Sequence, residues 1–254
     1  MSDYVLEVCV DSVESAIAAE KGGATRLELC ANLVIGGTTP SPVLFEAVRE
    51  AVELPINVLI RPRFGDFLYT NAECNIMQRE IAQFASLGAH AVVVGALRAD
   101  GSLDREVMSD LIAAAGDLRV TMHRAFDVCA DPLSVMEEAL ELGVDTILTS
   151  GQKANARAGR ELIGTLIEKA GKRADIMIGG GVDHGVVGEF LEDFPGIRAF
   201  HLSGKTVLDS GMRYRNREVS MGLPGISEFQ IWRTCEESIR LAREVLDRHR
   251  YMNR

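Results

Sequence analysis

Eight short apolar runs alternate with amphipathic segments along this chain of 254 residues. The runs cover residues 4–10, 26–30, 56–60, 90–94, 118–123, 146–149, 176–178 and 197–202. Each run with the segment after it has roughly the size of a strand–helix unit in a parallel sheet. Eight such units in succession, with no linker or change of composition between them, predict a single closed (β/α)8 TIM-like barrel over residues 1–254.

An open, doubly wound sheet is the alternative architecture, and the run Gly179, Gly180 and Gly181 raises it. The spacing of a dinucleotide-binding fingerprint fails here, because the residue three positions past Gly181 is His184. That fingerprint also belongs in the first strand–helix unit, whereas these glycines follow the seventh run. The closed barrel is therefore the better prediction.

The C-terminal part departs from the regular pattern. Residues 204–226 show no clear periodicity and predict an extra long loop, which would leave the barrel at the carboxyl end of its strands. Such a loop serves either as a lid over a site or as a cap or oligomer contact. Ser227 and Gln230 have the spacing of a helix capping box and predict a final helix beginning at Ser227.

Composition excludes several classes of protein. The chain has 27 Lys and Arg against 37 Asp and Glu, a net charge of −10, so nucleic acid and anionic membranes are not expected partners. No apolar run reaches the ~20 residues of a membrane span, and residues 1–4 lack the pattern of a signal peptide. The five cysteines form no C-x-x-C pair. A cytoplasmic protein with reduced thiols is expected.

Residues two apart on a strand share a face, so polar side chains are predicted inside the barrel. If Leu6 and Val8 pack against helices, Glu7 and Cys9 point inward, as do Glu28 and Cys30 on the second strand. Further polar residues near the carboxyl ends of strands three, five, six and eight are Arg61, Arg63, His123, Arg124, Asp127, Thr149, His201 and Ser203. Two interpretations remain open, a polar plug of buried Glu–Arg pairs without chemistry and an active site.

An anion site is the more specific form of the second interpretation. Barrels of this type often bind phosphate through backbone N–H groups in the glycine-rich turns that follow strands seven and eight. The predicted anion-binding residues are Arg61, Arg63, Arg124, Gly180, Gly181, Ser203 and Lys205. If the protein is an enzyme, the candidate catalytic residues are Glu7, Glu28, His123, Asp127 and His201.

Cys9 and Cys30 raise a different possibility. Adjacent strands lie roughly 4.8 Å apart, so two cysteines at matching heights could share one ion. Two soft thiolates suit Cu(I). Buried cysteines also pack simply as small apolar groups, so both interpretations stand. A divalent metal bound by Glu7, Glu28 and His201 is a further variant.

Taken in order, these segments resemble the CutC family of copper homeostasis proteins from residue 5 to about residue 222. The matching segments are residues 7–12 (EVCVDS), 27–30 (LELC), 36–41 (GGTTPS), 60–63 (IRPR), 65–67 (GDF), 121–127 (TMHRAFD), 148–151 (LTSG) and 212–216 (MRYRN). Phe64 follows Arg63 where many relatives have glycine, a departure that narrows the expected cavity mouth.

The resemblance implies a cytosolic TIM-like barrel that forms a homodimer or a higher homo-oligomer and binds Cu(I), with Cys9 and Cys30 as the copper-binding cysteines. Two functions are therefore expected. One is a copper homeostasis protein without turnover, in which the barrel glutamates pair with Arg61. The other is an enzyme for a small phosphorylated or carboxylated substrate, with Arg61, Arg63 and Lys205 holding the anion.

Overall fold

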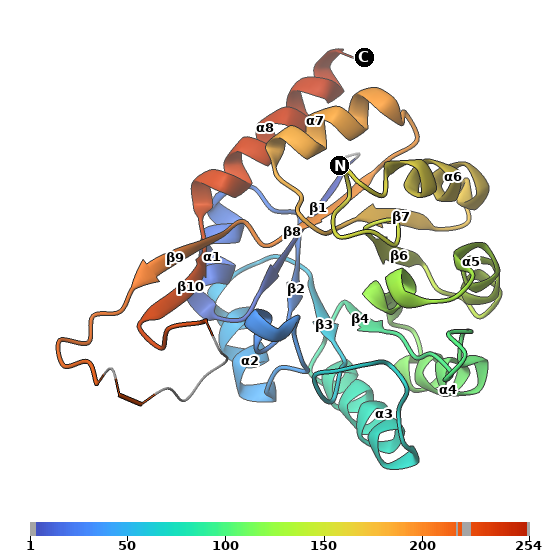
Figure 1. Ribbon diagram of the computed structural model, residues 1–254, viewed down its shortest axis with the longest axis horizontal. Helices are drawn as coiled ribbons and strands as arrows, with labels where there is room; N and C mark the ends of the chain where they lie inside the picture. Colours follow the sequence, from blue (N-terminus) through green and yellow to red (C-terminus); the bar gives the residue numbers. More distant parts are fainter. Residues whose placement is uncertain (1–3, 217, 220–224, 253–254) are drawn as a thin grey trace.

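Eight parallel strands close into a barrel, and the helices lie around its outside (Figure 1). The computed structural model describes residues 4–216, 218–219 and 225–252. The barrel strands are β1 (Val5–Val10), β2 (Arg26–Leu29), β3 (Ile56–Leu59), β4 (Ala91–Val94), β5 (Arg119–Met122), β6 (Thr146–Thr149), β7 (Asp175–Ile178) and β8 (Ala199–Leu202). Each strand pairs with the next, and β8 pairs with β1. The predicted (β/α)8 barrel is confirmed.

Among the described residues, seven α-helices follow the first seven strands, and an eighth lies near the C-terminus. They are α1 (Val13–Lys21), α2 (Pro42–Ala51), α3 (Asn71–Ser86), α4 (Arg105–Ala115), α5 (Pro132–Glu141), α6 (Arg160–Ala170), α7 (His184–Asp193) and α8 (Glu236–Met252). Side-chain caps fix several of the starts. Thr70 and Glu73 form a capping box at α3, and Asp131 accepts two backbone N–H bonds ahead of the first-turn Pro132 of α5.

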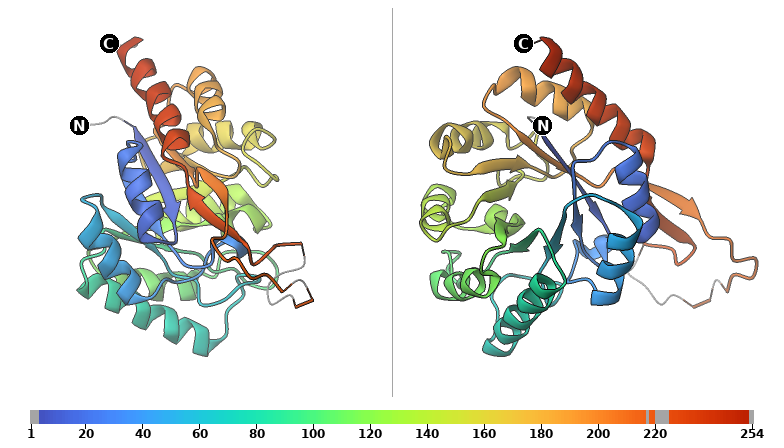
Figure 2. Two further views of the ribbon diagram at one scale, coloured as in Figure 1. Left: turned by 90° about the vertical axis from the view of Figure 1, so that its left-hand side faces the viewer. Right: turned by 180° about the vertical axis from the view of Figure 1, so that it is seen from behind.

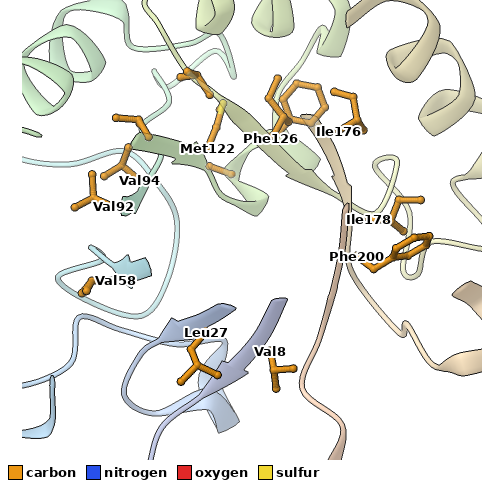
Figure 3. Close-up of a cluster of buried hydrophobic side chains, with 14 of the residues drawn as sticks. Val8, Leu27, Val58, Val92, Val94, Met122, Phe126, Ile176, Ile178 and Phe200 are labelled. Carbon is orange, nitrogen blue, oxygen red and sulfur yellow. The ribbon is translucent and has the colours of Figure 1, made fainter. Parts of the chain in front are cut away.

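The apolar core lies between the barrel and its helices. Figure 3 shows part of it, with Val8, Leu27, Val58 and Phe200 among buried side chains that face the helices. Because side chains alternate along a strand, the intervening residues point to the barrel axis. The same alternation that buries the aliphatic residues under the helices therefore directs polar ones into the interior.

A two-stranded hairpin begins within the long loop predicted at residues 204–226, because residues 205–209 form a strand. Strands β9 (Lys205–Asp209) and β10 (Gln230–Thr234) pair antiparallel, and the hairpin projects beside the barrel (Figures 1 and 2). The prediction of a helix from Ser227 was wrong. Ser227 accepts N–H bonds from Phe229 and Gln230 in a tight turn, and the alternating sequence that follows pairs with β9.

The last helix begins at Glu236 and packs against α7 and α1, completing the outer ring (Figure 2). Close approach requires glycine at two positions beneath it. A Cβ at Gly22 would lie 2.6 Å from Ile239 Cβ, and one at Gly204 would lie 2.5 Å from Ile239 Cδ1. Among the residues described, no helix combines the length and apolar character needed to cross a membrane.

Candidate functional site

A cavity of about 250 Å³ lies at the carboxyl end of the barrel and is bordered by the β9–β10 hairpin. Of the predicted site residues, it is lined by Cys9, Glu28, Arg61, His123, Arg124, His201, Ser203 and Lys205. Glu7, Cys30, Arg63, Asp127, Gly180 and Gly181 are not among its lining residues. The hairpin adds Trp232 and Arg233, which sequence reasoning missed because residues 227 onward were assigned to a helix.

Glu7 is fully buried, and hydrogen bonds occupy both of its carboxylate oxygens. Oε2 accepts from Arg26 Nε at 2.6 Å and from Asn57 Nδ2 at 2.9 Å, while Oε1 lies 2.8 Å from His201 Nδ1. Burial alone would raise the pKa of Glu7, but Arg26 and His201 lower it to about 2. Glu7 is therefore an ionised anchor that fixes the position of His201.

Arg26, not Arg61 or Arg63, supplies the cation for Glu7, which corrects the predicted polar plug. Arg26 stands directly opposite Glu7 in the β1–β2 register and precedes Glu28 by two residues, so it faces the same interior. That spacing was visible in the sequence and could have identified Arg26. The correction leaves Arg61 without the partner expected for it.

Glu28 is buried directly opposite Cys9, and its Oε2 has no hydrogen-bond partner within the described chain. Burial raises the pKa of Glu28 to about 7, with the nearby Glu7 carboxylate acting in the same direction against His201 and Arg26. A carboxyl group with that pKa exchanges protons readily at neutral pH. Glu28 is thus suited to general acid–base chemistry.

His201 joins the two glutamates to the cavity. Its Nδ1 lies 2.8 Å from Glu7 and 4.0 Å from Glu28 Oε2, and it lines the cavity together with Cys9. Burial opposes the charged form, yet Cys9, Glu28 and Glu7 together raise the pKa of His201 well above its usual value. Ligand atoms of Glu7, Glu28 and His201 lie within 4.8 Å of one another, so these three residues could also hold a metal ion.

The pKa of His123 is shifted in the opposite direction from that of His201. Burial and the charge of Arg61 lower the pKa of His123 to about 3, so the imidazole is neutral. Its Nδ1 accepts a hydrogen bond from Ala125 N at 3.1 Å, which places the proton on Nε2. Nε2 is buried without a partner in the part of the chain described. His123 therefore offers a neutral N–H donor in the cavity wall.

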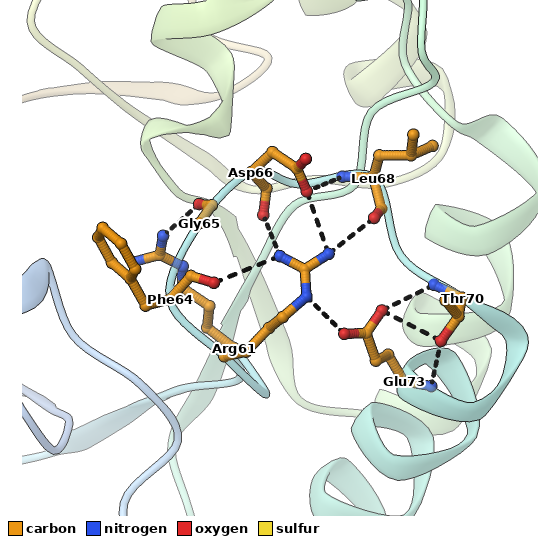
Figure 4. Close-up of polar contacts among 8 residues, drawn as sticks. Arg61, Phe64, Gly65, Asp66, Leu68, Thr70 and Glu73 are labelled. Atoms are coloured by element: carbon orange, nitrogen blue, oxygen red, sulfur yellow. Dashed lines mark hydrogen bonds and ion pairs between the residues drawn. The ribbon is translucent and has the colours of Figure 1, made fainter.

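Arg61 is a buried cation held by neutral groups. Its guanidinium donates to the carbonyl oxygens of Gly36, Gly37 and Gly65 and lies over the Phe67 ring, 5.0 Å from the centroid; Figure 4 draws the bond to Gly65. Within the described residues no carboxylate forms an ion pair with it, and Nε has no partner. Its positive charge is thus uncompensated beside the cavity.

Arg63, only two residues further on, is directed away from the cavity. It pairs with Glu73 of the α3 capping box and with Asp66, and its guanidinium lies over Tyr69. Figure 4 shows Glu73 with Thr70 beside this network. Since its charge is already neutralised, the structure does not bring Arg63 to the predicted anion site.

Arg124 lines the cavity but is engaged by Asp127, with Nε 2.6 Å from its Oδ2. Asp127 also accepts from Thr149, Ser150 and Gln152, so it holds the loops after β5 and β6 together. The Gly180 carbonyl accepts from Ala156 N, and a Cβ at Gly181 would lie 3.3 Å from Asn155 Cβ. These glycines belong to a neighbouring turn rather than to the cavity wall.

Ser203 and Lys205 do line the cavity, as part of the chain that leads into the hairpin. Lys205 Nζ lies 4.2 Å from the centre of the Trp232 ring. Arg233 is 3.7 Å from Glu14 on α1. The hairpin therefore adds positively charged side chains to the lining of the cavity that Arg61 also borders.

The two cysteines lie at different heights, contrary to the register expected from the sequence. Cys9 pairs with Glu28, and Cys30 comes two residues later, just past the end of β2, because strands in a barrel are staggered. Cys30 is fully buried beside Leu59, and its thiol donates to the Val10 carbonyl at 3.4 Å. Burial and the neighbouring Cys9 raise the pKa of Cys30 well above its ordinary value.

Comparison with known proteins assigns the chain to a family. The CutC family model matches residues 4–206. The chain belongs to the CutC family. This CutC chain is 46% identical over 219 residues to the human copper homeostasis protein cutC homolog, covering 86% of this chain and 80% of the relative.

Bacterial CutC proteins are similarly close to this CutC chain. A CutC family protein of Parabacteroides distasonis is 44% identical, with 93% of this chain and 98% of the relative covered. The crystal structure of a CutC protein from Streptococcus agalactiae superposes with a TM-score of 0.74 at 30% identity, covering 79% of this chain and 98% of that one. The family resemblance predicted from the sequence is confirmed.

Proposed function

We propose that this CutC protein is an enzyme that binds a small carboxylated or phosphorylated substrate in the barrel cavity and moves protons on it. The observation that carries the proposal is Arg61, a buried cation with no carboxylate partner among the described residues. A guanidinium in that state favours an oxyanion, which it can bind through charge-assisted hydrogen bonds. Glu28 and His201 would be the proton-transfer groups.

The cavity explains why an acidic protein would hold an anion. The net charge of the chain is −10, so long-range attraction does not favour such a ligand. Locally, Arg61 and Lys205 both border a cavity of about 250 Å³, and Lys205 has no ion pair in the described chain. Ser203 adds a hydroxyl, and His123 Nε2 adds a neutral donor.

Calorimetric titration with inorganic phosphate tests this proposal. We expect saturable binding to the wild type at millimolar ligand, and a loss of about 10- to 100-fold in Arg61→Ala, since a hydrogen bond to a charged group contributes about 1.5–3 kcal/mol. Arg63→Ala is the matched control, because Arg63 lies outside the cavity lining. Absence of saturable binding to the wild type, or equal loss in both variants, would overturn the proposal.

Copper binding is a second candidate. Cys9 and His201, two relatively soft donors, both line the cavity, and the human relative is described as a copper homeostasis protein. We propose Cu(I), a cargo rather than a resident cofactor, as the ion, with Cys9 and Cys30 as the ligands. Cys30 would have to give up its hydrogen bond to Val10. A cytoplasmic location and a homodimer or higher homo-oligomer are further parts of this proposal.

Titration of the reduced protein with Cu(I) under anaerobic conditions tests the second candidate, copper binding. Wild type is expected to bind about one Cu(I) per chain, and Cys9→Ser/Cys30→Ser is expected to lose tight binding. The control is Cys74→Ser/Cys129→Ser, which removes two thiols outside the cavity. Unchanged affinity in the Cys9 and Cys30 double variant would eliminate these ligands.

A further inference from the structure

Two pairs of side chains line the cavity, and each pair combines a cation with a neutral N–H donor. Arg61 and His123 form the first pair, and both lie against the ring of Phe67. The Arg61 guanidinium carbon is 5.0 Å from the centroid of that ring, and the imidazole centroid is 4.9 Å from it. Lys205 and Trp232 of the hairpin form the second pair, with Lys205 Nζ 4.2 Å from the indole centroid. The same combination of groups therefore occurs twice in one cavity.

Both pairs contain buried N–H groups that lack a hydrogen-bond partner in the described chain. These groups are Arg61 Nε in the first pair, His123 Nε2 beside it, and Trp232 Nε1 in the second pair. A buried polar group without a partner is costly, and native proteins contain few of them. Three such N–H groups on residues lining one cavity indicate a ligand that brings hydrogen-bond acceptors to both pairs.

The cation of each pair also has no carboxylate partner within the described residues. The Arg61 guanidinium donates to backbone carbonyl oxygens, and the ammonium group of Lys205 lies over an aromatic ring. Arg124 and Arg233, which also line the cavity, each have a carboxylate nearby, from Asp127 and from α1 respectively. Two of the four cations in the lining thus remain for the negative charge of a ligand.

The two pairs belong to different parts of the fold. Arg61 and His123 follow β3 and β5 of the barrel. Lys205 lies opposite Thr234 in the β9–β10 register, and Trp232 is two residues from Thr234, so both members of the second pair share one face of the hairpin. Each pair therefore has its own cation, its own unpartnered N–H group and its own structural support.

We infer that the substrate carries two separate oxyanion groups, as a dicarboxylate or a phosphorylated carboxylic acid does, one bound by Arg61 and His123 and the other by Lys205 and Trp232. This inference deepens the proposed function and rests on it for the first oxyanion alone. Guanidinium and ammonium groups both bind carboxylate and phosphate oxygens. The hairpin then determines specificity, because a substrate with one oxyanion group would leave the second pair without acceptors.

Calorimetric titration with matched small acids tests the inference. The dicarboxylates from malonate to adipate are each compared with the unbranched monocarboxylate of the same number of carbons, and phosphoglycolate is compared with methyl phosphate. At least one acid with two oxyanion groups should bind wild type about 10-fold more tightly than its matched acid, the effect of one additional hydrogen bond to a charged group. Whether a dicarboxylate or phosphoglycolate binds more tightly identifies the chemistry of the second group.

Variants of the hairpin assign the second oxyanion to its pair. Lys205→Ala, and Trp232→Phe, which removes the indole N–H but keeps an aromatic ring, should each weaken binding of the preferred acid by about 10-fold. Binding of its matched acid should stay unchanged in both, whereas Arg61→Ala should weaken both acids. Arg213→Ala is the control, because Arg213 is an exposed cation between the hairpin strands that does not line the cavity. Lys205 is exposed as well, so Lys205→Ala decides the question even if Trp232→Phe fails to fold.

Failure of this inference differs from failure of the proposed function. If phosphate binds through Arg61 but no acid with two oxyanion groups binds more tightly than its match, the second oxyanion is wrong and the proposed function stands. Equal loss of the matched acid in Lys205→Ala and Arg61→Ala would mean that both pairs hold one oxyanion, which also contradicts the inference. Absence of saturable binding for phosphate and for all of these acids would reject both.

Discussion

Replacing Glu7 with alanine is expected to lower the free energy of unfolding by about 3–5 kcal/mol, because it leaves a buried charge without its partner. Arg26 is 6% exposed, and its Nε is bonded to Glu7 Oε2. Asn57 and His201 lose a hydrogen-bond partner in the same substitution. Few single changes elsewhere in the barrel would disturb so many buried polar groups at once.

Urea unfolding at neutral pH measures the Glu7 effect. Glu137→Gln is the matched control, because it removes a glutamate from an ion pair with Arg173 at the protein surface, where water screens the charges. The control should unfold close to the wild type. A loss in Glu7→Ala no larger than in the control would mean that the Glu7 network does not stabilise the barrel.

The same network has a defined pH dependence. The pKa of Glu7 falls from 4.5 to about 2 on folding. A carboxyl group with a lowered pKa contributes stability above its unfolded value and loses that contribution as the pH falls through the folded value. The contribution of Glu7 to stability is therefore lost between roughly pH 4.5 and pH 2, and the stability of Glu7→Gln should lack that pH-dependent fall.

Replacing Glu28 with glutamine is expected to stabilise the protein at pH 8. The folded protein raises the pKa of Glu28 from 4.5 to about 7, so between these values it holds a proton that the unfolded chain has released. Stability from this group is full below pH 4.5 and is lost as the pH rises through 7. At 1.36 kcal/mol per pKa unit, the loss amounts to about 3 kcal/mol at pH 8, and the neutral amide avoids it.

Urea unfolding of wild type and Glu28→Gln at pH 5, 6, 7 and 8 measures this second effect. The two curves should diverge as the pH rises, with the variant more stable at pH 8. Glu46→Gln, on the exposed side of α2, is the control for removing one negative charge. Parallel curves for wild type and Glu28→Gln would show that Glu28 is not held in a destabilised, proton-exchanging state.

Diverging curves, with Glu28→Gln the more stable protein at pH 8, would identify Glu28 as a residue kept at a cost to stability. Its carboxyl group is buried beside Glu7, a second carboxylate, and Oε2 lacks a partner in the described structure. Functional groups are often held in this way, since activity requires a group with a shifted pKa and with hydrogen-bonding capacity left for the substrate. Glu7, by contrast, is fully bonded and serves as support.

The barrel could be predicted because its signals are local and repeated. Each strand is a short apolar run, and helix caps such as Thr70 with Glu73 are encoded within four residues. The inward direction of Glu7 and Glu28 followed from the two-residue period of strands. These features depend on neighbours in sequence, so they needed no knowledge of tertiary structure.

Register could not be read in the same way. Placing Cys9 opposite Cys30 assumed strands at equal height, whereas barrel closure requires a stagger that sets Cys9 opposite Glu28. The direction of the arginines after β3 was also hidden. β3 ends at Leu59, so strand alternation no longer orients Arg61 and Arg63, and loop carbonyls and Glu73 orient them instead.

The hairpin was missed for a related reason. Ser227 and Gln230 have the spacing of a helix cap, but the residues after them alternate and find a partner strand in β9. Pairing between segments about 25 residues apart is a tertiary choice that local propensity does not decide. The missed hairpin is also what places Trp232 and Arg233 at the cavity.

The crystal structure of this protein grown with inorganic phosphate, and separately with Cu(I) under anaerobic conditions, tests the central claim most directly. We predict an oxyanion in the barrel cavity, within hydrogen-bond distance of the Arg61 guanidinium. Electron density for an ion bridging the Cys9 and Cys30 sulfurs, with no oxyanion at Arg61 in the phosphate crystals, would contradict the account.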